Sequence, residues 1–188
     1  ENEIIDNKSR SESSLMIEKE NEELKSLLNR RVDKNFILAY VLKKPPLSPY
    51  DSLILDIGHD KNIKKGDIVY FGLNIPIGYI SDVYDKTSKV VLYSSPQEKF
   101  NAYITSRNIE ITAFGKGGGG FEAQLPRDAQ VSRGDHVYIP DISPSVLGYV
   151  DKVVFEPTNP FLTVLFSQPV NIFELKWVNI LSELNDIK

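Results

Sequence analysis

The chain carries two stretches in which the same short motifs recur in the same order, and this internal repeat constrains its fold more than any other feature. Residues 63–83 and 131–153 each contain a Gly-Asp pair, then an apolar run, then a Gly-Tyr pair. The repeated turn residues are Gly66, Asp67 and Gly78 in the first copy and Gly134, Asp135 and Gly148 in the second. A repeat of this length predicts two units of the same architecture.

Each copy is typical of strands joined by turns. Glycine accepts a positive φ, and an aspartate side chain can bond nearby backbone N–H groups, so Gly-Asp favours a tight turn. Runs rich in β-branched and aromatic residues follow each turn. The first half predicts strands near 36–42, 52–57, 68–73, 77–85, 89–93 and 101–104. The second half predicts strands at 109–114 and 121–125, three more in the repeat, and a last one at 174–180.

Six short strands can hide their edges by closing into a barrel, so the fold class is predicted as mainly β. The predicted order is an N-terminal coiled-coil helix followed by two small six-stranded β-barrel domains related by the repeat. The predicted divisions are 1–34 for the helix, 35–107 and 108–180 for the two barrels, and 181–188 for a C-terminal tail. The last strand could instead return to the first barrel, and the sequence leaves this open.

Three further features carry specific expectations. Residues 36–42 are apolar at successive positions, which predicts a strand buried on both faces. The glycine-rich stretch 115–120 predicts a turn or flexible loop. Trp177 is expected to be a core residue or an anchor between the domains.

The N-terminal segment is polar, and it lacks glycine and proline up to about residue 33. Its self-association residues are predicted to be Ile17, Asn21, Leu24 and Leu28, which occupy the a and d positions of one heptad frame. An asparagine at an a position commonly fixes register in parallel two-stranded coiled coils, so a parallel dimer is predicted. The alternative is a solvated helix that packs on its own domain.

Composition limits the classes of partner and compartment. The 188 residues have a formal net charge of −4 and no cysteine, so no nucleic-acid partner, disulfide or thiolate chemistry is predicted. No run is long and apolar enough to cross a bilayer. The sequence starts at Glu1 instead of Met, which is compatible with a longer natural protein whose anchor precedes Glu1.

Two tandem barrels raise the possibility of a serine protease, and the sequence argues against it. The two histidines, His59 and His136, lie in a turn and at the start of a strand. Ser143 and Ser145 flank a proline with no glycine nearby to form an oxyanion hole. A protein without enzymatic activity is therefore predicted.

Metal and phosphate sites are also not predicted. Asp56, His59 and Asp60 could ligate a metal by spacing alone, but one histidine with two turn carboxylates is more typical of solvated loops. The lysine in 115–120 precedes the glycines and a strand follows, so this stretch is not a phosphate-binding loop. The sequence predicts no cofactor and no metal.

A short coiled-coil segment precedes a series of stretches in a fixed order: 48–56, 63–70, 77–80, 115–120, 134–135 and 147–150. The order and spacing of these parts resemble the extracytoplasmic region of the rod-shape-determining MreC family, over nearly the whole chain. The loop 139–144 departs from the Thr-Ser-Gly type turn of that family.

The resemblance implies a scaffold of the cell-wall elongation machinery that is needed for rod shape. It implies a position on the extracytoplasmic face of the bacterial inner membrane, a single N-terminal anchor, and dimers that can assemble further. The implied partners are penicillin-binding proteins and other membrane proteins of the elongation complex.

Two other functions remain open from the sequence. A periplasmic adaptor of a secretion or efflux system also joins helices to β-barrels, although it typically inserts a long helical hairpin into a lipoyl-like domain. A catalytically dead two-barrel protease that binds peptides would need a crevice lined by aromatic residues and an open strand edge.

Overall fold

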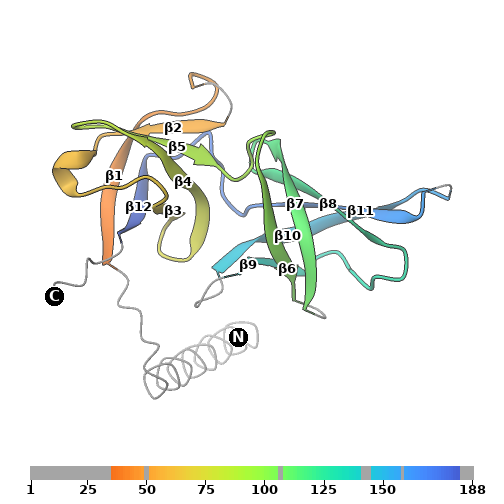
Figure 1. The fold of residues 1–188 in the computed structure, drawn as a ribbon. Helices are drawn as coiled ribbons and strands as arrows, with labels where there is room; N and C mark the ends of the chain where they lie inside the picture. Colours follow the sequence, from red (N-terminus) through yellow and green to blue (C-terminus); the bar gives the residue numbers. More distant parts are fainter. Residues whose placement is uncertain (1–34, 49–50, 106–107, 141–144, 158, 183–188) are drawn as a thin grey trace, which may run out of the picture. The chain divides into compact units, whose positions relative to one another are not determined.

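A computed structural model describes residues 35–48, 51–105, 108–140, 145–157 and 159–182 (Figure 1). These residues contain twelve strands and one short 3-10 helix, His59–Lys61. The strands are β1 Asn35–Lys43, β2 Ser52–Leu55, β3 Ile68–Phe71, β4 Ile75–Val83, β5 Ser88–Leu92, β6 Lys99–Ile104, β7 Ile109–Gly117, β8 Gly120–Pro126, β9 His136–Ile139, β10 Ser145–Phe155, β11 Phe161–Ser167 and β12 Trp177–Ser182. The predicted coiled-coil helix of residues 1–34 lies outside the described residues.

The strands form two closed antiparallel barrels of six strands each, as predicted. The first has the order β1-β12-β3-β4-β5-β2, and the second has the order β10-β11-β8-β7-β6-β9. Every strand pairs with two neighbours, so neither barrel leaves an open edge along which peptides or other chains could pair.

Corresponding strands have the same order around the two barrels, but the barrels begin with different strands along the chain. Around the second barrel, β6 lies between β7 and β9; around the first, β12 lies between β1 and β3. The prediction that 101–104 closes the first barrel is therefore wrong, because that strand is β6 of the second barrel. The alternative that the last strand returns to the first barrel is confirmed. The barrels consequently do not follow the predicted boundary between residues 107 and 108.

The repeated Gly-Asp turns have matching geometry. Gly66 and Gly134 have φ values of 97° and 91°, which a side chain disfavours. The N–H of Gly66 donates to the carbonyl oxygen of Ile80, and that of Gly134 to Val150, both at 2.8 Å. In each turn the aspartate carboxylate accepts an N–H three residues earlier, at 2.8 Å from Lys64 and 2.9 Å from Ser132.

The second glycine of each copy permits close strand packing instead. A Cβ built on Gly78 would lie 2.2 Å from the carbonyl oxygen of Val91, and one on Gly148 would lie 2.2 Å from that of Ser167. Both positions therefore exclude any side chain for the same reason.

Each barrel has its own hydrophobic core. Alternate residues of β1 and β12 point into the first core, which also receives Val170 and Ile172 from the connection between β11 and β12. Phe121 and Phe166 stack at the centre of the second core, with ring centroids 5.0 Å apart. The connection from the second barrel is therefore part of the first core.

Two sequence expectations need correction. Strand β1 is buried on one face only, because Leu38 and Leu42 point outward and are 58% and 50% exposed. Trp177 is 52% exposed and is not a core residue. The turn predicted within 115–120 is confirmed: β7 and β8 extend into this stretch, and Gly118 and Gly119 form a tight hairpin turn with positive φ.

Candidate interaction site

The predicted self-association residues Ile17, Asn21, Leu24 and Leu28 lie outside the described residues. The six predicted turn residues stabilise the turns and the close strand contacts described above, and they form no separate binding surface. The candidate functional features lie at the junction of the two barrels and on their outer faces.

The described residues bring together no catalytic pair of the serine-protease type. Ser145 and His136 lie on the paired strands β10 and β9, where Ser145 pairs with Ile139 and His136 pairs with Tyr149. Four residues along a strand span about 13 Å, too far for a hydrogen bond. His59 lies in the 3-10 helix of the other barrel. Ser143 is outside the described residues.

The carboxylates that could have held a metal are used by the backbone. Asp56 accepts the N–H of Tyr40 at 2.7 Å, and Asp60 accepts the N–H of Gly58 at 3.2 Å. Across the described part of the chain, no group of three or more histidine, cysteine, aspartate or glutamate side chains could hold a metal ion.

Side-chain hydrogen bonds join the two barrels at their junction. Gln168, at the end of β11, is 7% exposed, and its Nε2 donates to the carbonyl oxygen of Pro76 in β4 at 2.8 Å. Asp51, before β2, accepts at Oδ2 from the N–H of Gly118 at 2.7 Å and from Ser94 Oγ at 3.1 Å. These bonds fix the β7–β8 hairpin against the first barrel.

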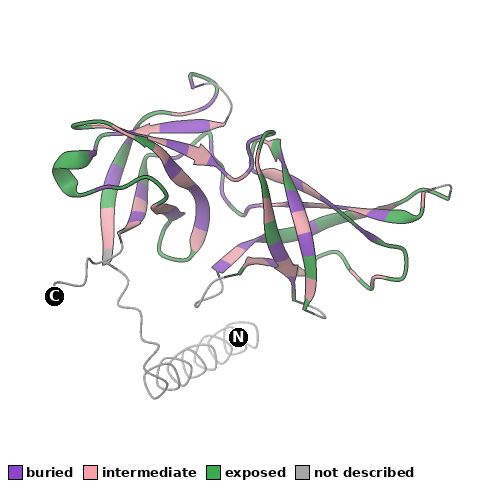
Figure 2. Cartoon of the chain, viewed as in Figure 1, coloured by how far each residue is buried: buried purple, intermediate pink, exposed green. Residues whose placement is uncertain are grey.

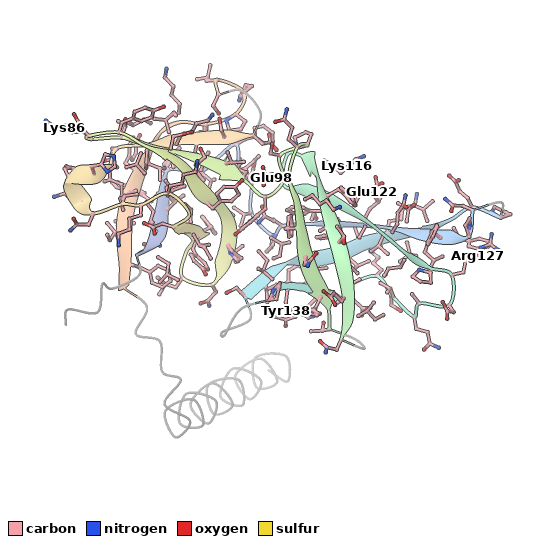
Figure 3. The ribbon with its side chains drawn as sticks, viewed as in Figure 1. Lys86, Glu98, Lys116, Glu122, Arg127 and Tyr138 are labelled. Atoms are coloured by element: carbon pink, nitrogen blue, oxygen red, sulfur yellow. The ribbon has the colours of Figure 1, made fainter. Side chains whose placement is uncertain are left out.

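Aromatic side chains continue this junction. Tyr79 of β4 contacts Tyr93, and Tyr93 contacts Phe100 of β6, with ring centroids 6.0 Å and 5.1 Å apart. The hydroxyl of Tyr79 donates to Glu98 Oε2 at 3.0 Å (Figure 3 labels Glu98). Burial, followed by the hydrogen bond to Glu98 and its negative charge, raises the pKa of Tyr79 above its usual value of 10.0.

A small hollow opens between the barrels beside these rings. Its volume is about 130 Å³, and its walls are mainly apolar. The lining residues are Ile68, Tyr70, Pro76, Tyr93, Ile139, Pro140 and Ser145. A hollow of this size accommodates one side chain and is smaller than a cavity for a cofactor or drug-sized ligand.

Sequence reasoning missed the residues that build this junction. Asp51 and Gly118 are 67 positions apart, and Gln168 and Pro76 are 92 positions apart, so no local pattern connects them. The repeat pointed to one residue of the junction, Tyr79, but it could not distinguish it from its counterpart in the second copy. Tyr79 and Tyr149 occupy matching positions, yet Tyr149 is 38% exposed and faces His136, 4.8 Å away between ring centroids. Of these two tyrosines, only Tyr79 contacts the aromatic side chains at the junction.

No helix among the described residues combines the length and apolar character needed to cross a bilayer.

Comparison with known proteins gives one family match: residues 41–182 match the model described as the barrel core of the rod shape-determining protein MreC. No curated protein matches.

Several solved structures share the fold. An MreC structure from Listeria monocytogenes is 20% identical and covers 98% of this chain and 96% of its own, with a TM-score of 0.77. MreC from Pseudomonas aeruginosa is 15% identical and covers 79% of this chain and 99% of its own, with a TM-score of 0.70. A complex between penicillin-binding protein 2 and MreC from Helicobacter pylori is 12% identical over 80% of this chain and 100% of the matched one, with a TM-score of 0.55.

Proposed function

Because a family model matches most of its length, the chain belongs to the MreC family, and on that premise we propose that it is a non-catalytic scaffold of the cell-wall elongation machinery. Its two barrels act at the extracytoplasmic face of the inner membrane and organise penicillin-binding proteins. The observation that carries the proposal is the family match over residues 41–182. The solved complex between penicillin-binding protein 2 and an MreC protein supports this class of partner.

The junction suits a scaffold because it limits movement between the two barrels. A surface that spans both barrels binds with less loss of conformational entropy if their relative position is already fixed. The buried bond from Gln168 to Pro76 and the bonds of Asp51 contribute to this fixation. The aromatic contacts of Tyr93 add apolar packing to them.

Self-association is the second part of the proposal. The residues Ile17, Asn21, Leu24 and Leu28 form the seam of a parallel dimer, and an anchor upstream of Glu1 holds both chains to the membrane. A paired scaffold presents each weak surface twice, so the second contact with a clustered partner becomes intramolecular. Higher assemblies extend the same principle.

Binding to a penicillin-binding protein of the same cell tests the proposal. The 188-residue chain should bind the immobilised extracytoplasmic part of the elongation transpeptidase with a Kd on the order of 10 µM. A transpeptidase dedicated to division is the matched control and should bind at least about tenfold more weakly. Equal binding to both, or covalent labelling of the chain by an active-site serine probe, contradicts the proposal.

A further inference from the structure

The outer face of the first barrel carries large apolar side chains where two neighbouring strands pair. Leu38, Tyr40 and Leu42 of β1 point outward and are 58%, 40% and 50% exposed. Trp177 of β12 pairs with Tyr40, is 52% exposed, and places its ring 5.0 Å from the tyrosine ring. We call these four residues the outer β1–β12 face. Exposed and buried residues alternate along β1 (Figure 2).

The second barrel provides an internal comparison, because β7 and β6 occupy the positions of β1 and β12. The outward residues of β7 include Glu110, Thr112 and Lys116, and Lys116 forms an ion pair with Glu122 of β8 at 3.0 Å (Figure 3). Phe114 also points outward, but Lys99 lies over its ring at 5.6 Å. An outward sheet face is ordinarily polar in this way.

The outward face of β1 in the first barrel therefore differs from that of its counterpart β7 in the second barrel. Its outward residues on β1 are apolar at three successive alternate positions, 38, 40 and 42. Contiguous apolar surface rimmed by polar residues is typical of an interaction site. The difference between the barrels cannot be ascribed to the fold, because both have the same strand order and pairing.

From this we infer that the outer β1–β12 face is a contact between two copies of this chain. The inference rests on the self-association in the proposed function. Strand β1 starts at Asn35, immediately after the segment that carries the predicted seam. Parallel pairing of that segment delivers the β1 strands of both copies to the same place, so their outward faces lie within reach of each other.

The size of the face favours this occupant over an independent partner. Half-exposed leucine, tyrosine and tryptophan side chains offer on the order of 100 Å² each, so the face offers about 400 Å². A stable interface between separate proteins usually buries about 800 Å² on each side. A smaller contact suffices when a second interaction already holds the copies together. A two-fold interface also uses the same patch on both copies, as one continuous face allows.

The absence of cysteine in all 188 residues permits a site-specific test. Leu38→Cys and Leu42→Cys place single thiols on the outer β1–β12 face. Phe161→Cys places a thiol on β11 of the second barrel, where the native side chain is 45% exposed, as the matched control. With a short bis-maleimide reagent and the full chain, thiols at 38 and 42 should form covalent dimers at least about tenfold faster than the thiol at 161.

Sedimentation of the same samples separates the two possible failures. A dimer whose thiols at 38, 42 and 161 react at equal rates overturns the contact and leaves the proposed self-association in place. Because helices of this length are marginal alone, these samples carry the native sequence upstream of Glu1, and an extended chain that stays monomeric overturns both ideas. Binding to the transpeptidase still tests the scaffold separately. As a second measurement, Leu38→Ser with Leu42→Ser should weaken the dimer about tenfold without changing its circular dichroism, whereas Phe161→Ser should not weaken it.

Discussion

At the scale of single residues, the repeat uses glycine for two different physical reasons. Gly66 has a φ of +97°, and a Cβ there would meet nothing within 4 Å, so only backbone strain opposes a side chain. Gly78 carries no such strain, but a Cβ would lie 2.2 Å from the carbonyl oxygen of Val91. The two positions should therefore respond differently to the same substitution.

Alanine substitution tests this distinction. Gly66→Ala should lower the free energy of unfolding by about 1–2 kcal/mol, the cost of a left-handed residue. Gly78→Ala should cost about 3 kcal/mol or more, because backbone must move to relieve the clash. Urea titrations followed by circular dichroism measure both values. An equal or smaller loss for Gly78→Ala contradicts the packing argument.

Tyr79 gives a prediction on pH. Because the pKa of Tyr79 is raised in the folded state, the fold holds this proton more tightly than the unfolded chain does. The stability that Tyr79 contributes is therefore fully present below pH about 10, and it is lost as the pH rises through the raised pKa of the folded state. Tyr79→Phe should make the decline shallower, and it should cost about 1 kcal/mol at neutral pH through the lost hydrogen bond to Glu98.

The matched control is Tyr84→Phe, because Tyr84 is 56% exposed. Unfolding free energies of wild type and both variants between neutral and alkaline pH provide the comparison. If Tyr79→Phe and Tyr84→Phe follow the same pH profile, the environment of Tyr79 is not the cause of the decline.

Residues that act through local partners could be predicted from the sequence. Gly66 and Asp67 satisfy backbone groups within their own turn and its neighbouring strand, so turn chemistry suffices to place them. Gln168 could not be placed, because its partner Pro76 lies on the other barrel. A buried glutamine and an exposed one look the same in a sequence until the tertiary contact is known.

At the scale of strands, the repeat correctly indicated two closed barrels but not which strands close them. The prediction assumed that neighbours in sequence share a barrel, which usually holds. Here β12 crosses back to the first barrel, and Val170, Ile172 and Leu175, which precede it in the chain, are packed in the first core. Periodicity also overstated the burial of β1, because apolar residues on an outward face resemble core residues.

A permuted fragment should recover the first barrel by itself. Ser182 pairs with Asn35, as Ile104 pairs with Ile109 in the second barrel, where residues 105–108 join the two strands. A chain of residues 168–182, a linker as long as 105–108, and residues 35–96 contains every strand of the first barrel in order. It should unfold cooperatively in urea.

The control is the continuous fragment 35–107, which follows the boundary predicted from the sequence. It lacks β12 and leaves β1 and β3 with unpaired edges, so it should show no cooperative transition and should aggregate. Cooperative unfolding of the continuous fragment, or none in the permuted one, contradicts the assignment of β12 as the strand that closes the first barrel.

At the scale of the whole molecule, the described residues provide two barrels joined through buried contacts, and the remaining question is how many copies act together. In the natural chain order, the strand β12 that closes the first barrel follows the whole second barrel. Truncation of the natural chain within the second barrel should therefore also open the first, unless β12 is joined to β1 as in the permuted fragment. Self-association would add a second level of organisation to this two-barrel unit.

Substitutions at the predicted seam residues test whether the chain dimerises through its N-terminal segment. Leu24→Asp with Leu28→Asp puts two charges into the predicted seam and should abolish dimerisation, while the circular dichroism of the β domains stays unchanged. Asn21→Leu should strengthen association and loosen its specificity, because a parallel, in-register pair satisfies both asparagine amides and leucine removes that requirement. Glu18→Gln, outside the seam, is the matched control and should change little.

Helices of this length are marginal alone, so these measurements should use chains extended upstream by the native sequence. Sedimentation measures the dimer, and binding to immobilised transpeptidase measures its consequence. The aspartate variant should bind densely immobilised transpeptidase at least about tenfold more weakly than wild type, and sparsely immobilised transpeptidase equally well, because only the dense surface allows a second contact. A wild type that stays monomeric at high micromolar concentration, or that binds both surfaces as the variant does, would leave the N-terminal segment only the role of a spacer.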